Sequence, residues 1–264
     1  MTGKSLKQNA KRGRGDGRRP GRPRRRRSAT ALQPGALERT AIVERAFAMT
    51  ATVALADLSI VRLAADLGVR PGTIHYHLES RENLITAVMN RFYRGILEAI
   101  EAGKAGATWQ DELRRYGKVW LEAKLSRPGI ANYIAANDKF RVFQKPVDGE
   151  PDHGARFMDR VFALLLAAGF TPEDAAQCWH LMALYTNATA QTIAMKHAPA
   201  EHSSFLLGQA KRYDKTAYPG LAHALPSLAR LDARAAYKRS FDDLLAGYTA
   251  QIAASSKKPR PNEH

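Results

Sequence analysis

The side chains best suited to molecular recognition lie close together, within residues 59–81. Hydrogen-bonding groups occur at the start of a short segment where a proline and a glycine leave room for another molecule to approach. Such groups read base edges in the major groove of DNA. The candidates for base contacts are Arg70, Gly72, Thr73 and His75, and Pro71 together with Gly72 keeps the approach to DNA close. The candidates for phosphate contacts, which position a protein without specifying sequence, are Ser59, Tyr76 and Arg81.

Two short helices, predicted over residues 60–67 and 71–77, hold these side chains. Helices that cross over a tight turn need a small residue at the crossing, a turn residue that tolerates positive φ, and an aliphatic plug. Ala64, Gly68 and Ile74 occur at the required spacing. The pattern is typical of a helix-turn-helix, whose second helix is expected in the major groove. For Tyr76 and for its neighbour at position 77, packing against adjacent helices is the alternative.

The rest of the chain is predicted to be helical, so the fold class is all-α. From residue 37 onward apolar residues recur at helical intervals, and no stretch alternates with period two. Helices are predicted over residues 38–51, 60–67, 71–77, 81–101, 109–126, 129–137, 152–168, 172–196 and 232–253, with short helices within 198–230. The predicted N-caps are Ser59, Ser80, Thr108 and Thr171.

Charge is concentrated at the N-terminus. The 264 residues carry a formal net charge of +16, and residues 1–37 hold 12 basic side chains and one acidic one, net +11. With few apolar residues, this segment is interpreted as a disordered basic arm that binds DNA without sequence preference. Alternatively, residues 20–24 resemble the Gly-Arg-Pro core of an AT-hook, which would place Arg22 and Arg24 in a narrow minor groove.

Enzyme and metal chemistry find no support in the motifs. The sequence has no Gly-x-Ser-x-Gly elbow, no phosphate-binding glycine loop and no Cys or His set at metal-ligand spacing. His75 and His77 are two apart on a helix and diverge, so no metal and no cofactor is expected. Cys178 is the only cysteine, which indicates a reducing compartment. The longest apolar run, residues 161–170, is too short to span a membrane and no signal peptide is found, so a cytoplasmic protein without membrane contact is expected.

Residues 38–94 resemble the TetR family of bacterial transcription regulators. The family signature is close to Thr-Leu-Tyr-x-His-Phe-x-x-Lys-x-x-Leu, and residues 73–84 read Thr-Ile-His-Tyr-His-Leu-Glu-Ser-Arg-Glu-Asn-Leu. His75 stands where the family has Tyr, Leu78 where it has Phe, and Arg81 where it has Lys. Arg70 occupies the place of a Ser or Thr cap. Arg81 keeps a phosphate-directed cation. We therefore expect the fold and DNA binding to survive these departures, which affect only the details of the operator.

The resemblance implies an N-terminal three-helix helix-turn-helix DNA-binding domain followed by a helical ligand-binding and dimerisation domain. The expected boundaries are 1–37 for the disordered arm, 38–94 for the DNA-binding domain, 95–254 for the ligand-binding and dimerisation domain, and 255–264 for a disordered tail. The implied function is a repressor that binds a palindromic operator in double-stranded DNA as a homodimer and is released by a small-molecule effector. The alternative is an architectural protein that binds DNA nonspecifically through its arm.

In the family, two helices of each subunit form a four-helix dimer interface, corresponding here to residues 172–196 and 232–253. The apolar stripes expected there are Ala175, Cys178, Trp179, Met182, Thr186, Thr189 and Ile193 on the first helix, and Tyr237, Phe241, Leu244, Tyr248 and Ile252 on the second. Packing within one subunit is the alternative. An effector pocket is expected among helices four to eight, with aromatic walls and a polar strip. Its candidate residues are Tyr116, Trp120, Tyr133, Asn137, Phe157, Trp179, His180, Asn187 and Gln191.

Overall fold

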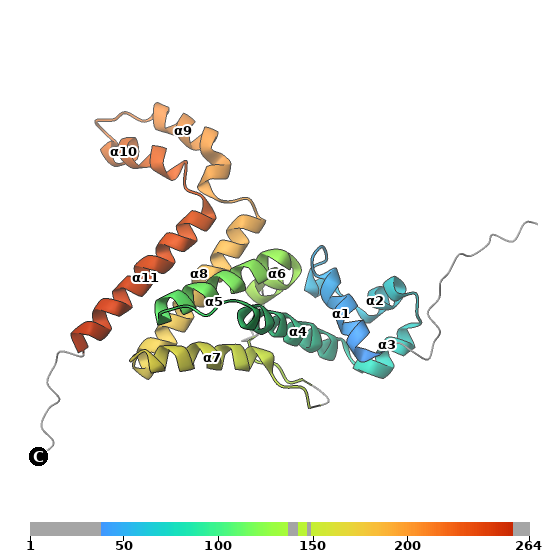
Figure 1. Ribbon diagram of the computed structural model, residues 1–264. Helices are drawn as coiled ribbons and strands as arrows, with labels where there is room; N and C mark the ends of the chain where they lie inside the picture. Colours follow the sequence, from blue (N-terminus) through green and yellow to red (C-terminus); the bar gives the residue numbers. More distant parts are fainter. Residues whose placement is uncertain (1–37, 137–141, 147–148, 256–264) are drawn as a thin grey trace, which may run out of the picture. The chain divides into compact units, whose positions relative to one another are not determined.

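The computed structural model describes residues 38–136, 142–146 and 149–255, and every regular element within these ranges is a helix (Figure 1). The described residues all belong to one compact unit. The elements are α1 (Arg39–Met49), the 3-10 helix η1 (Leu55–Asp57), α2 (Ile60–Leu67), α3 (Pro71–Leu78), α4 (Arg81–Ala102), α5 (Trp109–Ser126), α6 (Pro128–Ala136), α7 (His153–Ala167), α8 (Pro172–Ala194), the 3-10 helix η2 (Pro199–His202), α9 (Ser203–Arg212), α10 (Pro219–Leu228) and α11 (Ala233–Ser255). The all-α prediction is confirmed.

Helix starts follow the predicted capping residues. The side-chain oxygens of Ser59, Ser80, Thr108 and Thr171 each accept a hydrogen bond from the backbone N–H three residues on, at 3.1 Å in every case. Each bond satisfies one of the backbone donors that a helix leaves unpaired in its first turn. These four caps therefore explain why α2, α4, α5 and α8 begin where they do.

The core is built around α4 and α8. Helix α4 packs against α1, α3, α5 and α7, whereas α8 packs against α5, α6, α7 and α11. Phe92 of α4 and Phe157 of α7 are among the largest fully buried side chains. One continuous apolar cluster thus runs from α1 to α11, and α4 contacts both the helix-turn-helix and the larger helical body.

Helices α9 and α10 pack on each other as a hairpin between α8 and α11 (Figure 1). This agrees with the short helices predicted within residues 198–230. Unusually many large apolar side chains of the segment are exposed: Phe205, Leu207, Tyr213, Tyr218, Leu221, Leu228 and Leu231. Among the described helices, none combines the length and apolar character that a membrane crossing requires.

The apolar stripes assigned to a dimer interface lie largely inside the subunit, so that prediction is wrong in its choice of faces. Cys178, Met182 and Thr186 of α8 and Phe241 of α11 are buried in the single chain. The Thr186 and Tyr237 hydroxyls form a hydrogen bond of 3.1 Å between α8 and α11. The two helices present these faces to each other and to α5 rather than to a second copy.

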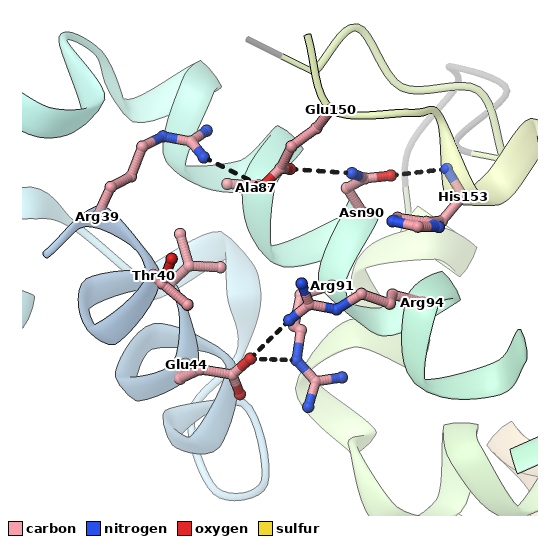
Figure 2. Close-up of a pocket in the computed structure, with 10 residues that line it drawn as sticks. Arg39, Thr40, Glu44, Ala87, Asn90, Arg91, Arg94, Glu150 and His153 are labelled. Atoms are coloured by element: carbon pink, nitrogen blue, oxygen red, sulfur yellow. Dashed lines mark hydrogen bonds and ion pairs between the residues drawn. The ribbon is translucent and has the colours of Figure 1, made fainter. Parts of the chain in front are cut away.

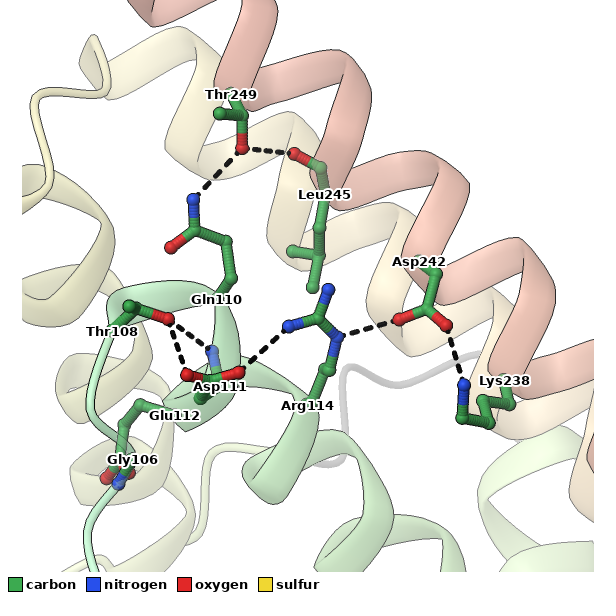
Figure 3. A network of polar contacts seen from close by, with 10 residues as sticks. All are labelled: Gly106, Thr108, Gln110, Asp111, Glu112, Arg114, Lys238, Asp242, Leu245 and Thr249. Carbon is green, nitrogen blue, oxygen red and sulfur yellow. Dashed lines mark hydrogen bonds and ion pairs between the residues drawn. The ribbon is translucent and has the colours of Figure 1, made fainter.

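Polar contacts hold α11 on the start of α5 (Figure 3). Arg114 Nε donates to Asp242 Oδ1 at 2.7 Å, and Gln110 Nε2 donates to Thr249 Oγ1 at 3.1 Å. At Gly117 the helices approach so closely that a Cβ atom there would lie 2.9 Å from the Phe241 ring. This intrachain packing is the physical reason that the stripe on α11 is unavailable to a partner.

Candidate nucleic-acid interface and effector site

The crossing of α2 and α3 has the predicted helix-turn-helix construction. Ala64 and Ile74 are fully buried where the helices meet. Gly68 has φ 69°, a left-handed conformation that glycine adopts without a Cβ clash. The Val69 N–H donates to the Ala64 carbonyl at 3.0 Å, which closes a Schellman motif at the end of α2. The turn is therefore fixed by backbone bonds and by one glycine.

The outer face of α3 presents the residues selected for base and phosphate contacts. Arg70, Pro71, Gly72, His75 and Tyr76 are exposed and Thr73 is half-buried. Tyr76 is 84% exposed, so the alternative that it packs against neighbouring helices is excluded. His77 is half-buried, with its ring edge-on to Tyr76 at 5.1 Å between centroids. The buried side of α3 is made by Ile74 and Leu78, which leaves the opposite face free to meet a ligand.

A strained turn follows α3 and was not anticipated from the sequence. Glu79 has φ 61° and ψ −47°, and the Ser80 N–H donates to the Leu78 carbonyl at 2.6 Å. These values describe a γ-turn of the rare, strained type. His75 Nδ1 lies 3.0 Å from the Glu79 carbonyl, and because a carbonyl only accepts, Nδ1 carries the proton in this bond.

Arg81 and Ser59 have structural partners in addition to their predicted phosphate contacts. Arg81 Nε donates to the Leu58 carbonyl at 3.2 Å and Nη2 donates to the Ala56 carbonyl at 2.5 Å. The guanidinium thus ties the segment before α2 to the start of α4. The Ser59 hydroxyl oxygen accepts from the Arg62 N–H, which leaves its proton free to donate.

A group of ion pairs joins α1 to α4 (Figure 2). One Glu44 carboxylate oxygen accepts from Arg91 and also from Arg94, the latter at 2.8 Å. Asn90 on the same helix accepts from the His153 N–H at 2.9 Å and donates to Glu150 at 3.3 Å. The helix-turn-helix is therefore fastened to α4 at the level where the start of α7 also contacts it.

The aromatic residues proposed as effector-pocket walls form one buried cluster. The Trp120 and Trp179 rings are stacked with centroids 5.2 Å apart, and Phe157 packs against both, at 5.2 and 5.7 Å. Tyr116 and Tyr133 are buried as well. The structure brings all five aromatic residues into the same core.

The polar residues proposed for the same pocket are not gathered in this way. His180 is exposed, whereas Asn187 and Gln191 are half-buried on α8. His180 therefore does not face the aromatic cluster, because its side chain lies on the exposed face of α8 while the adjacent Trp179 is buried. Three predicted residues, Asn137, Arg22 and Arg24, lie outside the described residues.

Sequence reasoning missed Lys124, which is buried beside Trp120 of the aromatic cluster. It is 1% exposed, with Nζ 5.3 Å from the centroid of the Trp120 ring. Burial lowers the pKa of its ammonium to about 7, because the charged form loses its hydration. The only signal in the sequence is a lysine four residues after Trp120 on the apolar side of a helix.

Comparisons with known proteins agree with this architecture. Residues 102–252 match the family of tetracyclin repressor-like C-terminal domains. The HTH-type transcriptional repressor Rv1353c of Mycobacterium tuberculosis is 23% identical over 207 residues, covering 78% of this chain and 74% of that protein. Apo ActR from Streptomyces coelicolor has a TM-score of 0.67 at 21% identity and covers 85% of this chain and 100% of its own. SCO7222, a TetR from the same organism, has a TM-score of 0.66 at 21% identity, covering 81% and 99%.

The fold and the exposed face of α3 define a helix-turn-helix protein. The family match covers more than half of the chain, so the chain belongs to the TetR family. The family that residues 38–94 suggested is thereby confirmed. Members of this family are transcriptional regulators and not enzymes.

Proposed function

We propose that the protein is a ligand-responsive transcriptional repressor that binds a palindromic operator as a homodimer and releases it when a small-molecule effector binds. The observation that carries the proposal is the exposed face of α3. Hydrogen-bonding side chains from Arg70 to Tyr76 lie there, opposite the buried Ile74 and Leu78. A helix held in this way is suited to the major groove, with its first residues at base edges.

In this proposal residues 38–94 read DNA and residues 95–254 dimerise and sense. Arg70, Gly72, Thr73 and His75 contact bases, whereas Ser59, Tyr76 and Arg81 contact phosphates. The basic residues 1–37, net +11, add affinity for the DNA backbone. One α3 helix reads one half-site, so a two-fold dimer requires a site with two-fold symmetry.

We place the dimer interface on the outward faces of α8 and α11 instead of on the buried stripes. Leu184 is 47% exposed on α8, and Ala246, Gly247 and Ala250 are exposed on α11. Small side chains allow two helices to approach closely. The exposed apolar residues of the α9–α10 hairpin, of which Phe205 is 64% exposed, extend this surface towards the second copy.

Sedimentation tests the interface. The full chain is expected to be a dimer at micromolar concentration, and Leu184→Glu is expected to shift it towards monomer. Leu166→Glu on α7 is the matched control, because Leu166 is 48% exposed and lies on neither interface helix. A wild-type monomer, or equal dissociation of both variants, contradicts the proposed interface.

Effector release is proposed to act through α4, which packs against α5 and α7 as well as against α1 and α3. A ligand that shifts α4 moves α1 through the Glu44 ion pairs and so changes the spacing of the two reading helices. Crystal structures of ActR include a complex with actinorhodin, which supports an effector site in this fold. Because binding linkage is reciprocal, operator DNA must weaken effector binding by the same factor, typically about 5–150-fold.

Footprinting on the DNA upstream of the protein's own gene tests the function. A discrete protected palindrome is expected. Uniform protection along the DNA would instead favour the architectural protein that binds through its basic residues 1–37. Gel-shift titration with the palindrome and with a scrambled sequence of equal composition provides the control for nonspecific binding.

A further inference from the structure

Two neighbouring nitrogen donors in the aromatic cluster lack acceptors. Lys124 Nζ and Trp120 Nε1 are both buried, and neither has a hydrogen-bond partner among the described residues. Buried donors are nearly always paired, since an unpaired one forfeits its hydrogen bonds to water without replacement. Two such donors on successive turns of α5 indicate a missing acceptor.

The surroundings restrict what that acceptor can be. Lys124 Nζ lies 5.3 Å from the centroid of the Trp120 ring and 6.0 Å from that of Phe92. Trp179 stacks on the far side of the same cluster, parallel to Trp120 within 20°. Flat apolar walls suit a planar aromatic body, and a single lysine charge suits a monoanion.

Space for the body of such a molecule adjoins the cluster. A groove of about 500 Å³ runs between α4 and α5, and Phe92, Ile96 and Val119 are among its lining residues. Phe92 therefore faces both the groove and Lys124. Rotation of its side chain would connect the two and let a ligand reach the buried amine.

We propose that the effector is an aromatic carboxylate, an inference that rests on the proposed function. Its carboxylate oxygens accept from Lys124 Nζ and Trp120 Nε1, and its rings lie in the groove beside Phe92, Ile96 and Val119. The carboxylate supplies an acceptor to each of the two buried donors and a counter-charge to the ammonium. Displacement of Phe92, which belongs to α4, acts on the helix that carries the reading head.

The test uses planar aromatic carboxylates and their neutral primary amides as matched pairs: 2-naphthoate with 2-naphthamide, and anthraquinone-2-carboxylate with its amide. Binding to the full-length protein is followed by calorimetry and by quenching of tryptophan fluorescence. At least one acid is expected to bind wild type roughly tenfold to a hundredfold more tightly than its amide, the factor for one charge-assisted hydrogen bond. Lys124→Met should remove this preference while still binding the amide, which reports an intact pocket.

Lys118→Met is the control, because Lys118 is an exposed lysine on the same helix and should leave the preference unchanged. The inference is overturned if Lys124→Met keeps the preference, or if no acid in the panel binds wild type more tightly than its amide. Operator binding is measured in parallel by gel shift. If the protein binds its operator but does not discriminate acid from amide, only the assignment of the effector as a carboxylate is refuted. If it shows no discrete DNA binding, the proposed function is refuted.

Discussion

Replacing Lys124 by methionine should stabilise the protein, and the gain should depend on pH. Methionine matches lysine closely in length and volume but carries no charge. Lys124 is 1% exposed, and its Nζ has no hydrogen-bond partner among the described residues. The folded chain therefore bears the cost of removing an amine from water without an ion pair to offset it.

The size of the effect follows from the two pKa values. Burial lowers the pKa of Lys124 from 10.5 to about 7. This difference between the pKa values of the unfolded and folded states corresponds to a loss of at most about 5 kcal/mol in the free energy of unfolding. Below pH 7 lysine is charged in both states and the whole cost is present. Between pH 7 and 10.5 the unfolded chain retains a proton that the folded chain lacks, so stability rises with pH. We expect Lys124→Met to gain roughly 3–5 kcal/mol at pH 7 and little above pH 10.

Denaturant unfolding of wild type and variant between pH 6.5 and 9.5 measures this difference. The two free energies of unfolding should converge as pH rises, by up to about 1.4 kcal/mol per pH unit. Lys118→Met, at an exposed position of the same helix, should run parallel to wild type. A constant difference between wild type and Lys124→Met across this range would refute the reasoning, because it would show that the buried amine does not titrate there.

Three further outcomes are expected. Glu79→Gly should raise the free energy of unfolding by about 1 kcal/mol, because φ 61° strains any residue with a Cβ. A melting temperature below that of wild type would contradict this reasoning. Arg70→Ala should relax base preference at one operator position by about 1–3 kcal/mol, whereas Arg81→Ala should weaken all sequences alike, which binding-site selection distinguishes. Deleting residues 1–37 should make the slope of log K against log salt shallower by about 0.9 for each phosphate that these residues neutralise, and an unchanged slope would mean that they do not touch DNA.

Local signals in the sequence were sufficient for the helices and for the helix-turn-helix. Ser59 and Thr171 cap the helices predicted to begin after them, and Gly68 has the positive φ required of it. These features depend on neighbours within a few residues, so spacing alone predicts them. The exposed side of α3 follows from the same periodicity, because burying Ile74 turns Arg70 and Tyr76 outward.

Features that depend on long-range packing escaped prediction. An amphipathic stripe on α8 has the same appearance whether it faces α11 of its own chain or a second copy, and the Thr186–Tyr237 bond decides in favour of the former. In the sequence, Lys124 resembles an ordinary surface lysine of α5. It becomes buried only when α5 packs against α4. The strain at Glu79 is invisible as well, since glutamate carries no preference for a left-handed turn.

Helix α3 uses different residues for packing and for its exposed face, and this affects how operator preference can change among related regulators. Ile74 and Leu78 are the buried side chains of this helix, whereas the side chains of Arg70, His75 and Tyr76 are exposed. Substitutions at the exposed positions should alter which DNA is read at little cost to folding. New regulatory targets can therefore arise by a few exchanges on one helix while the sensing body stays as it is. If the proposed function holds, the same independence makes this helix a practical place to retarget the protein to a chosen promoter.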